Sequence, residues 1–159
     1  MLNINWSRTQ GMLKQQHLTV KTDINLLIDV LQWFEQFCQQ NLSELSWLGD
    51  GGANLNLAID MLKLALNEGF TNVVRHAHKN LPKETPIDLE LTLWDERLEI
   101  RIWDRGEPFE PPPLKAPDPD KLPIGGYGWF LIRRIADKVV HERCPDGRNC
   151  LLLVKRKIE

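Results

Sequence analysis

Three polar residues, which carry a carboxylate, an amide and an imidazole, interrupt the most apolar helical segment of the chain. Glu68, Asn72 and His76 stand four residues apart, which puts them on one face of a helix of about 3.6 residues per turn. That face could simply be the solvent-exposed side of the helix. A carboxylate and an amide on an apolar helix are costly unless something pairs with them, and the residues around them leave little room for a wet face: Met61, Leu62, Leu64, Ala65, Leu66, Phe70, Val73 and Val74. We therefore interpret the polar strip as the floor of a cleft.

A second candidate is an acidic residue at the end of an apolar strand. Asp104 closes the run RLEIRIWD, and Gly106 follows two residues later. Such a pair is often no more than a turn former. It can also accept a hydrogen bond from an amine that is held in a pocket, and a glycine at this place would let a ligand approach the backbone.

A third candidate is a cluster of glycines directly before an apolar helical run. Gly125, Gly126 and Gly128 open the segment that continues as WFLIRRIADKV. A glycine-rich hinge and helix cap would have the same composition. The bare N–H groups of a helix N-terminus attract anions, phosphates above all, and glycine lets the backbone come close to them. The cluster is therefore a candidate phosphate cradle.

The elements that must position these residues alternate between helices and strands. Apolar periodicity predicts three helices: from the N-cap Asp23 to about Gln40, from about Asn56 to Ala77, and over 128–137. Alternating residues predict strands over 17–22, 87–94 and 97–103, and a last hairpin around 145–148. This order favours an α+β fold, a two-layer α/β sandwich in which helices cover one face of a mixed, mostly antiparallel sheet.

Length and composition narrow the class of protein. The chain has 159 residues and a formal net charge of −2, so we expect one domain over 16–159 behind a loosely ordered segment at 1–15. The low charge and the lack of a basic stripe argue against a nucleic-acid partner. No apolar run is long enough to span a membrane, and the N-terminus lacks the apolar core of a signal peptide. Three cysteines, an odd and sparse count, fit a reducing cytoplasm.

Taken in order, the motifs resemble the ATP-binding fold shared by gyrase, a class of heat-shock chaperones, histidine kinases and mismatch-repair ATPases, the Bergerat fold. The strip E-x-x-x-N-x-x-x-H at 68–76 resembles the N box of that superfamily. Asp104-Arg105-Gly106 resembles its first glycine box, and Gly126-Tyr127-Gly128 resembles its second. The resemblance implies a histidine-kinase-like ATP-binding domain. It also implies an ATP lid at about 107–124, within the stretch 105–125 that holds seven of the ten prolines.

Within the superfamily, the chain is most similar to the anti-sigma-factor serine/threonine kinases of bacteria. N-E-x-x-T-N at 67–72, D-x-G-x-x-F at 104–109 and G-R at 147–148 are typical of that branch. A histidine kinase would need a dimerisation helix with a phospho-acceptor histidine, and none is recognisable in residues 1–40. Gyrase, the chaperones and the mismatch-repair ATPases need additional domains, and this chain is too short for them.

The resemblance implies a role for each polar candidate. Asn72 would ligate Mg²⁺, a hard cation that prefers oxygen ligands. Glu68 would be catalytic and would orient or deprotonate the hydroxyl of a protein serine. Asp104 would accept from the exocyclic amine of adenine, which favours ATP over GTP. Gly106 would allow close approach of the base.

The remaining roles concern the phosphates and the helix end. Gly125, Gly126 and Gly128 would cradle the phosphates together with the helix N-terminus. His76 stands at the position of the family's histidine, but no chemical step is assigned to it. It could equally cap the end of its own helix.

The resemblance also implies partners. A cytoplasmic anti-sigma factor of this kind would sequester a sigma factor and phosphorylate a STAS-type antagonist protein, and it would form a homodimer. The sequence departs from the pattern of this family in two places. Glu107 and Pro108 replace a frequent second glycine of the first box, and Cys150 is the nearest candidate for a threonine that relatives often carry beside the aspartate.

These departures leave a second class of function open. The chain could be an ATP-gated or nucleotide-independent switch that binds a partner without transferring phosphate. A plain α/β sandwich without any nucleotide would require all three motifs to be accidental.

Overall fold

Eleven elements follow one another in the computed structural model, which describes residues 11–49, 54–111 and 126–157. In chain order they are β1 (Met12–Lys21), η1 (Ile24–Leu26), α2 (Leu27–Gln40), η2 (Ser46–Leu48), α3 (Leu55–Asn72), η3 (Val73–Ala77), β2 (Pro86–Trp94), β3 (Arg97–Asp104), α4 (Gly126–Ile135), β4 (Lys138–Arg143) and β5 (Asn149–Arg156).

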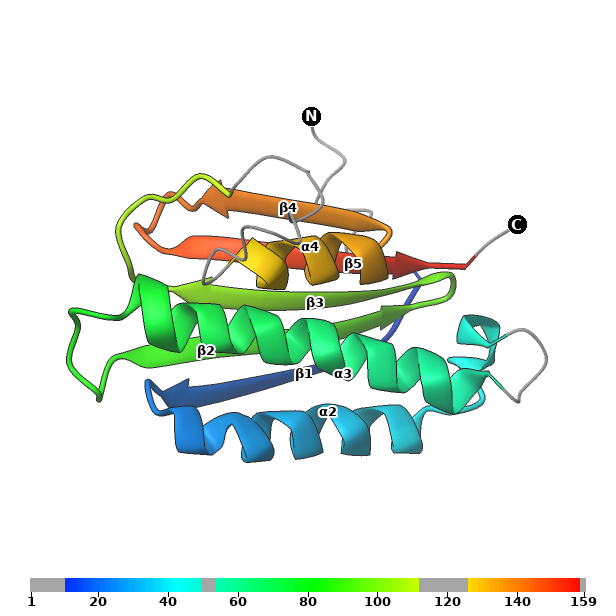
Figure 1. Ribbon diagram of the computed structural model, residues 1–159. Coiled ribbons are helices and arrows are strands. Elements are labelled where there is room, and N and C mark those ends of the chain that lie inside the picture. The colour runs from blue at the N-terminus through cyan, green and yellow to red at the C-terminus, as the bar shows by residue number, and fades with distance from the viewer. Residues whose placement is uncertain (1–10, 50–53, 112–125, 158–159) are drawn as a thin grey trace.

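The five strands form one sheet in the order β1-β2-β3-β5-β4. Figure 1 shows β4 and β1 as its two edges. The expected antiparallel arrangement is confirmed, and every pairing between described strands is antiparallel, so the sheet is not mixed. The register of β3 with β5 sets Asp104 opposite Asn149, which brings the end of one strand of the sheet beside the start of another.

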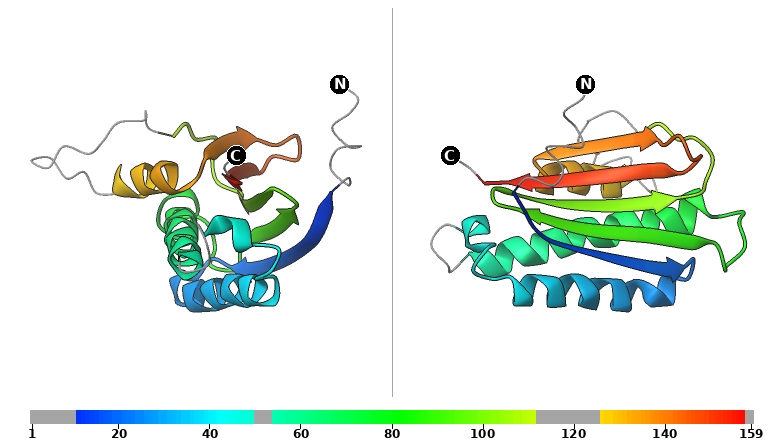
Figure 2. Two further views of the ribbon diagram at one scale, coloured as in Figure 1. Left: turned by 90° about the vertical axis from the view of Figure 1, so that its right-hand side faces the viewer. Right: turned by 180° about the vertical axis from the view of Figure 1, so that it is seen from behind.

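All three α-helices of the described chain cover the same face of the sheet. Seen from the side in Figure 2, the helices form one layer and the twisted sheet forms the other. Helix α3 packs between α2 and α4. The expected α+β sandwich of two layers is therefore confirmed.

The hydrophobic core lies between the two layers because the strands alternate and the helices carry apolar stripes. Residues of one strand face and the inner helix faces are almost fully buried: Phe34, Phe37, Leu62, Leu66, Phe70, Leu89, Leu91, Ile100, Ile102, Ile132 and Leu153. Full burial of such a side chain contributes roughly 1.5–3 kcal/mol. This packing fixes α3 against β3, and α3 carries the N box.

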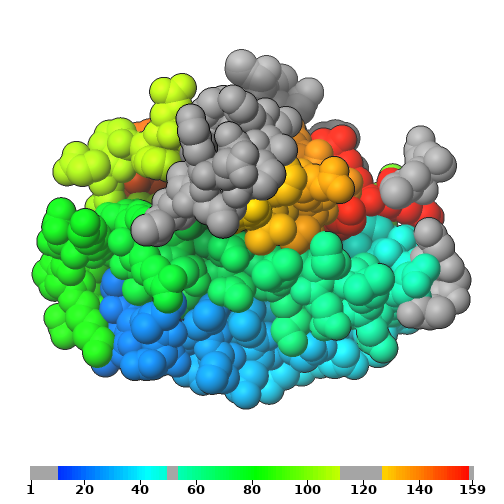
Figure 3. Space-filling model, viewed as in Figure 1, coloured from blue at the N-terminus to red at the C-terminus, as the bar shows by residue number. Residues whose placement is uncertain are grey.

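Helix α3 changes its hydrogen-bonding pattern at the N box. It forms the band between α2 and α4 on the face seen in Figure 3. It is α-helical as far as Asn72 and continues as the π-helix η3, in which the N–H of His78 donates to the carbonyl of Val73 at 2.8 Å. The predicted extent of this helix is confirmed, with a wider last turn. Such π-turns are common at functional sites.

Two predicted boundaries differ from the structure. Strand β1 begins at Met12, so residues 12–15 belong to the sheet rather than to a loosely ordered segment, because their backbone pairs with β2 as far as Trp94. Helix α4 begins at Gly126 rather than at residue 128, so both glycines of the second box lie in its first turn. The predicted N-cap is confirmed, since Asp23 accepts the N–H of Asn25 at 3.0 Å, although the first turn is the 3-10 helix η1.

Candidate nucleotide-binding site

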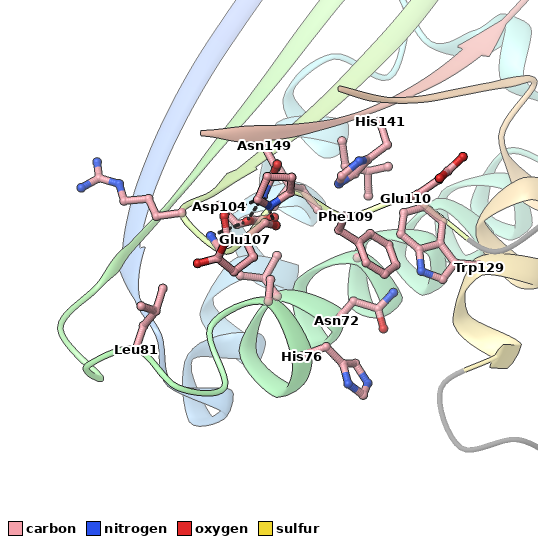
Figure 4. Close-up of a pocket in the computed structure, with 18 of the residues that line it drawn as sticks. Asn72, His76, Leu81, Asp104, Glu107, Phe109, Glu110, Trp129, His141 and Asn149 are labelled. Carbon is pink, nitrogen blue, oxygen red and sulfur yellow. Dashed lines mark hydrogen bonds between the residues drawn. The ribbon is translucent and has the colours of Figure 1, made fainter. Parts of the chain in front are cut away.

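A cavity of about 810 Å³ opens where the end of α3, the end of β3 and the start of α4 meet. Figure 4 shows side chains from these three elements and from β4 and β5 around it. Its size lies within the range of roughly 300–1,000 Å³ that is usual for small-molecule sites. Asn72, Asp104 and Gly106, three of the predicted site residues, line it. Of the predicted strip on α3, Asn72 and His76 line the cavity, whereas Glu68 is not among its lining residues.

The carboxylate of Asp104 is held through one of its two oxygens. Asp104 is 6% exposed, and its Oδ1 accepts the N–H of Gly106 at 2.9 Å and the Nδ2 of Asn149 at 2.9 Å. Within the described residues, Oδ2 accepts no hydrogen bond. Because two donors fix one oxygen, the other has a defined direction and can accept from an amine in the cavity.

Asn149 holds the backbone that follows Asp104 as well. Its Nδ2 also reaches the carbonyl oxygens of Gly106 and Glu107, both at 3.1 Å. Arg143 on β4 completes the arrangement by donating to the carbonyl of Gly106 at 2.9 Å and to Oδ1 of Asn149 at 3.2 Å. The first glycine box is therefore tied to the last strand pair by side-chain hydrogen bonds.

The residue beside Asp104 is Asn149, and the prediction that Cys150 takes this place is wrong. Successive residues of a strand point to opposite faces. Cys150 lies opposite Trp103 and shares its face, whereas Asn149 lies opposite Asp104 on the helix-bearing face. Burial raises the pKa of the Cys150 thiol to about 12. The alternation of Asn149, Leu151 and Leu153 was the sequence signal that could have identified Asn149.

Gly106 is required by a close contact between two backbone segments. A Cβ at this position would lie 2.5 Å from the carbonyl oxygen of Ala77, at the end of η3. Real Cβ atoms do not approach backbone so closely, so a side chain would push the turn away from the helix. The prediction assigned this glycine to the approach of a ligand, and the approach that the structure reveals is to the helix end.

Glu68 and Asn72 lie beneath the first turn of α4. A Cβ on Gly128 would lie 2.9 Å from Oε2 of Glu68 and 3.4 Å from Nδ2 of Asn72. Gly128 thus lets α4 come close to both N-box side chains. The Nδ2 of Asn72 is buried and has no hydrogen-bond partner among the described residues. An unpaired buried amide costs about 1–3 kcal/mol, so it points to a group that is bound there in function.

An aromatic wall forms the opposite side of the cavity, and the sequence interpretation did not predict it. The rings of Phe109 and Trp129 stack with centroids 5.8 Å apart, and the ring of His141 meets both edge-on at 5.6 and 5.9 Å. Figure 4 shows the three rings grouped together. Burial lowers the pKa of His141, and the nearby Asp104 carboxylate opposes this shift only in part. The wall is thus uncharged at neutral pH and suits the faces of a planar base.

Some predicted site residues lie at or beyond the edge of the described chain. Gly125 and residues 112–124 of the predicted lid lie outside the described residues. Gly126 is the first residue of α4. His76 lines the cavity and is exposed, and no contact of its ring with the described residues indicates a chemical step.

The residues present fit ATP and Mg²⁺. The unpaired amide of Asn72 offers either its oxygen or its nitrogen, because the two ends of an asparagine side chain are assigned from their partners. No group of three or more His, Cys, Asp or Glu in the described part of the chain could hold a metal. Mg²⁺ accepts such a setting, since it takes few protein ligands and completes its shell with phosphates and waters. Asn72 would hold it, and the cation would neutralise phosphate charge.

The fold and the cavity define a two-layer ATPase-type sandwich, and a family comparison agrees. The model of the histidine kinase-like ATPase domain matches residues 27–155. The chain belongs to this family.

Curated relatives carry the name serine-protein kinase RsbW. The protein of Listeria monocytogenes is 34% identical over 90 residues, which cover 52% of this chain and 57% of the relative. That of Oceanobacillus iheyensis is 37% identical over 90 residues, with 52% and 56% covered. The chain spans just over half the length of these relatives. The resemblance that the N box and the glycine boxes indicated is confirmed.

A solved structure supports the fold. The crystal structure of the RsbU and RsbW domains of a Mycobacterium tuberculosis protein superposes with a TM-score of 0.61. The superposition covers 91% of this chain and 32% of the Mycobacterium tuberculosis chain, at 16% sequence identity. No helix in the described ranges has the length and apolarity that a membrane span requires.

Proposed function

We propose that this protein is an ATP-dependent serine/threonine protein kinase of the anti-sigma-factor type. The observation that carries the proposal is that one cavity is lined by Asp104, with one carboxylate oxygen held by two donors, and by Asn72, with an unpaired buried amide. The first suits an adenine amine and the second suits a metal-bound phosphate.

At the base-binding end, Oδ2 of Asp104 would accept from the exocyclic amine of adenine. Guanine presents a carbonyl oxygen at the corresponding position, and two acceptors that face each other repel. The aromatic wall of Phe109, Trp129 and His141 would cover the base. ATP should therefore bind better than GTP.

At the phosphate end, Glu68 would accept the proton of a protein hydroxyl while the oxygen of that hydroxyl attacks the γ-phosphorus of ATP. The bond from that phosphorus to the bridging oxygen breaks, and ADP leaves. The contact between Glu68 and the first turn of α4, made possible by Gly128, would hold the carboxylate near the helix N-terminus. That terminus favours negatively charged phosphates.

The competing class, a switch that transfers no phosphate, loses one of its two supports. It rested partly on Cys150 as a weak replacement for a threonine beside Asp104. Asn149 occupies that position and donates to Asp104. The substituted Glu107 and Pro108 remain, and they follow a turn that Asn149 and Arg143 already fix.

The partners are inferred from the resemblance, and the relatives' names add only that those proteins are serine-protein kinases. We propose a sigma factor as the sequestered partner and a STAS-type antagonist as the phosphorylated one, in the cytoplasm. We also propose a homodimer, which sedimentation equilibrium would test.

The first experiment is a calorimetric titration with ATP and Mg²⁺, with GTP in a parallel arm. Asn72→Ala is compared with Asn56→Ala, an exposed asparagine on the same helix. Saturable binding of ATP and much weaker binding of GTP are expected, with affinity lost only in Asn72→Ala. Absence of binding at millimolar ATP would reject a nucleotide-dependent function.

The second experiment measures transfer to candidate STAS-domain proteins by detecting phosphoserine or phosphothreonine. Glu68→Gln should lower the rate by about 10²–10⁴-fold, as loss of a general base does, and should leave ATP affinity nearly unchanged. Glu84→Gln, an exposed glutamate outside the cavity, is the matched control. Equal transfer by Glu68→Gln and the control would exclude Glu68 as the base, and binding without transfer would favour the switch.

A further inference from the structure

His78 is a buried histidine that none of the proposed roles uses. It follows the π-helix η3 and is 1% exposed. Its Nε2 accepts the backbone N–H of Arg105 at 2.8 Å, and its Nδ1 lies 2.8 Å from the hydroxyl of Thr22. His78 therefore joins the end of the N-box helix to the middle of the first glycine box and to the end of β1.

The hydrogen bonds determine the protonation state of this ring. The hydroxyl of Thr22 donates its single proton to the carbonyl of Thr85 at 2.7 Å, so it can only accept from Nδ1–H of His78. Nε2 must carry no proton, since it accepts from Arg105. The neutral ring with its proton on Nδ1 satisfies all three contacts.

A second proton would break this arrangement. It would set an Nε2–H against the N–H of Arg105 at 2.8 Å. Of the nearby charged groups, the Asp104 carboxylate favours the protonated ring and the Arg105 guanidinium opposes it, and burial, the largest influence, lowers the pKa of His78. Asp23 and Lys83, which flank the Thr22 and Thr85 contacts, pair with each other at 3.3 Å.

We infer that neutral His78 is the positioning residue of the base-recognising turn, holding Asp104 in its binding orientation through the N–H of Arg105. The turn is then fixed from two sides, by Asn149 on β5 and by His78 at the helix end. Nucleotide affinity should depend on the neutral state of His78. The nucleotide part of this inference rests on the proposed function.

The first test is an NMR titration of the histidine ring nitrogens, which needs no nucleotide. His78 should show the Nδ1–H tautomer at neutral pH, and its protonation should coincide with increased hydrogen exchange at the Arg105 amide. His17 and His76, both exposed, serve as internal references. Thr22→Val should disturb the tautomer, whereas Thr22→Ser should preserve it. An Nε2–H tautomer, or an Arg105 amide that does not respond, would overturn the inference.

The second test is ATP affinity between pH 5.5 and 8 for the wild type, His78→Gln and the control His17→Gln. A glutamine can accept from Arg105 and does not titrate. Protonation of the nucleotide affects both proteins equally, so it cancels in the ratio of the wild-type dissociation constant to that of His78→Gln. This ratio should rise as the pH falls below the pKa of His78, by at most about tenfold per pH unit. His17→Gln should follow the wild type.

The outcomes separate the two proposals. A ratio of affinities that stays constant across a pH range in which the NMR titration shows His78 becoming protonated would overturn the role of His78 while leaving the kinase proposal intact. No ATP binding at any pH would reject the proposed function, and the NMR titration would still decide whether His78 holds the turn. His78→Leu, if it folds, should bind ATP about tenfold more weakly than His78→Gln at every pH, because the Arg105 N–H loses its acceptor.

Discussion

Asn149 donates its side-chain amide to the carboxylate of Asp104 at 2.9 Å, across the β3–β5 strand pair and between positions 45 residues apart in the chain. The contact gives the carboxylate of Asp104 a fixed direction. Replacement by Ala would leave Asp104 and the carbonyls of Gly106 and Glu107 without this donor.

Asn149→Ala should weaken ATP binding and narrow the preference for ATP over GTP, with a loss of about 1–3 kcal/mol in the free energy of unfolding. Cys150→Ala is the matched control, because the neighbouring side chain points to the other face of the sheet. It should lose some stability and keep the wild-type affinities. Calorimetry with both nucleotides measures this, and equal affinities in the two variants would contradict the role of Asn149.

Gly128→Ala should impair nucleotide chemistry more than folding. The new Cβ would lie 2.9 Å from Oε2 of Glu68, and a flexible carboxylate can move away from it at small cost. Movement would displace Glu68 from its place beneath α4. ATP affinity or phosphoryl transfer should fall while the thermal unfolding midpoint changes little; a large drop in that midpoint alone would show that the contact is structural.

Gly106→Ala should impair folding more than nucleotide chemistry. Here the Cβ would meet the backbone carbonyl of Ala77 at 2.5 Å, and backbone at the end of a helix cannot move aside without disturbing the fold. We expect a loss of about 1–3 kcal/mol, as for other overpacked sites, measured by denaturant unfolding. Unchanged stability would mean that the turn can shift as a unit.

The three cysteines should differ in reactivity. Burial raises the pKa of Cys38 and of Cys150 to about 12, so neither forms the reactive thiolate at neutral pH. Cys144 is only partly buried. A thiol-specific chromogenic reagent should modify Cys144 first in the folded protein and the other two only on unfolding. Cys144→Ser should abolish the fast phase; a remaining fast phase would reveal opening around a buried thiol.

Stability should fall as the pH drops below the ordinary histidine value of about 6.5. Burial lowers the pKa values of His78 and His141 in the folded state, so the unfolded chain binds protons that the folded chain does not. Their contribution is present above that value and is lost toward lower pH. Each histidine adds at most about 1.4 kcal/mol per pH unit.

Urea unfolding between pH 7 and pH 5 measures this slope. His78→Gln should flatten it, and His76→Gln, at an exposed position, should not. The carboxylates whose pKa values are lowered titrate below this window, so they do not obscure the result. If the pH dependence of stability has the same slope in the wild type, His78→Gln and His76→Gln, protonation of His78 does not cause it.

Local patterns along the chain determined most of the architecture. Alternation in residues 87–94 and 97–103 predicted the central hairpin, and apolar periodicity predicted α2 and α3. These features depend on residues a few positions apart in the chain. The N-box residues Glu68 and Asn72 could be recognised because they too are defined by local spacing, and Asp104 because it ends an apolar strand just before Gly106. The predicted antiparallel sandwich and the family followed from them.

Only the tertiary structure decided which side chains support those residues. Whether Asn149 or Cys150 faces Asp104 depends on strand register, since a shift of one residue exchanges the two faces of a strand. Likewise, the approach of Gly106 to Ala77 and the capture of Arg105 by His78 depend on how α3 and its wider last turn pack against the end of β3. The sequence by itself determined the candidate site residues and the elements that carry them, because both depend on local residue types and spacings. Packing between distant segments decided how those groups are held, because it depends on contacts that no local pattern records.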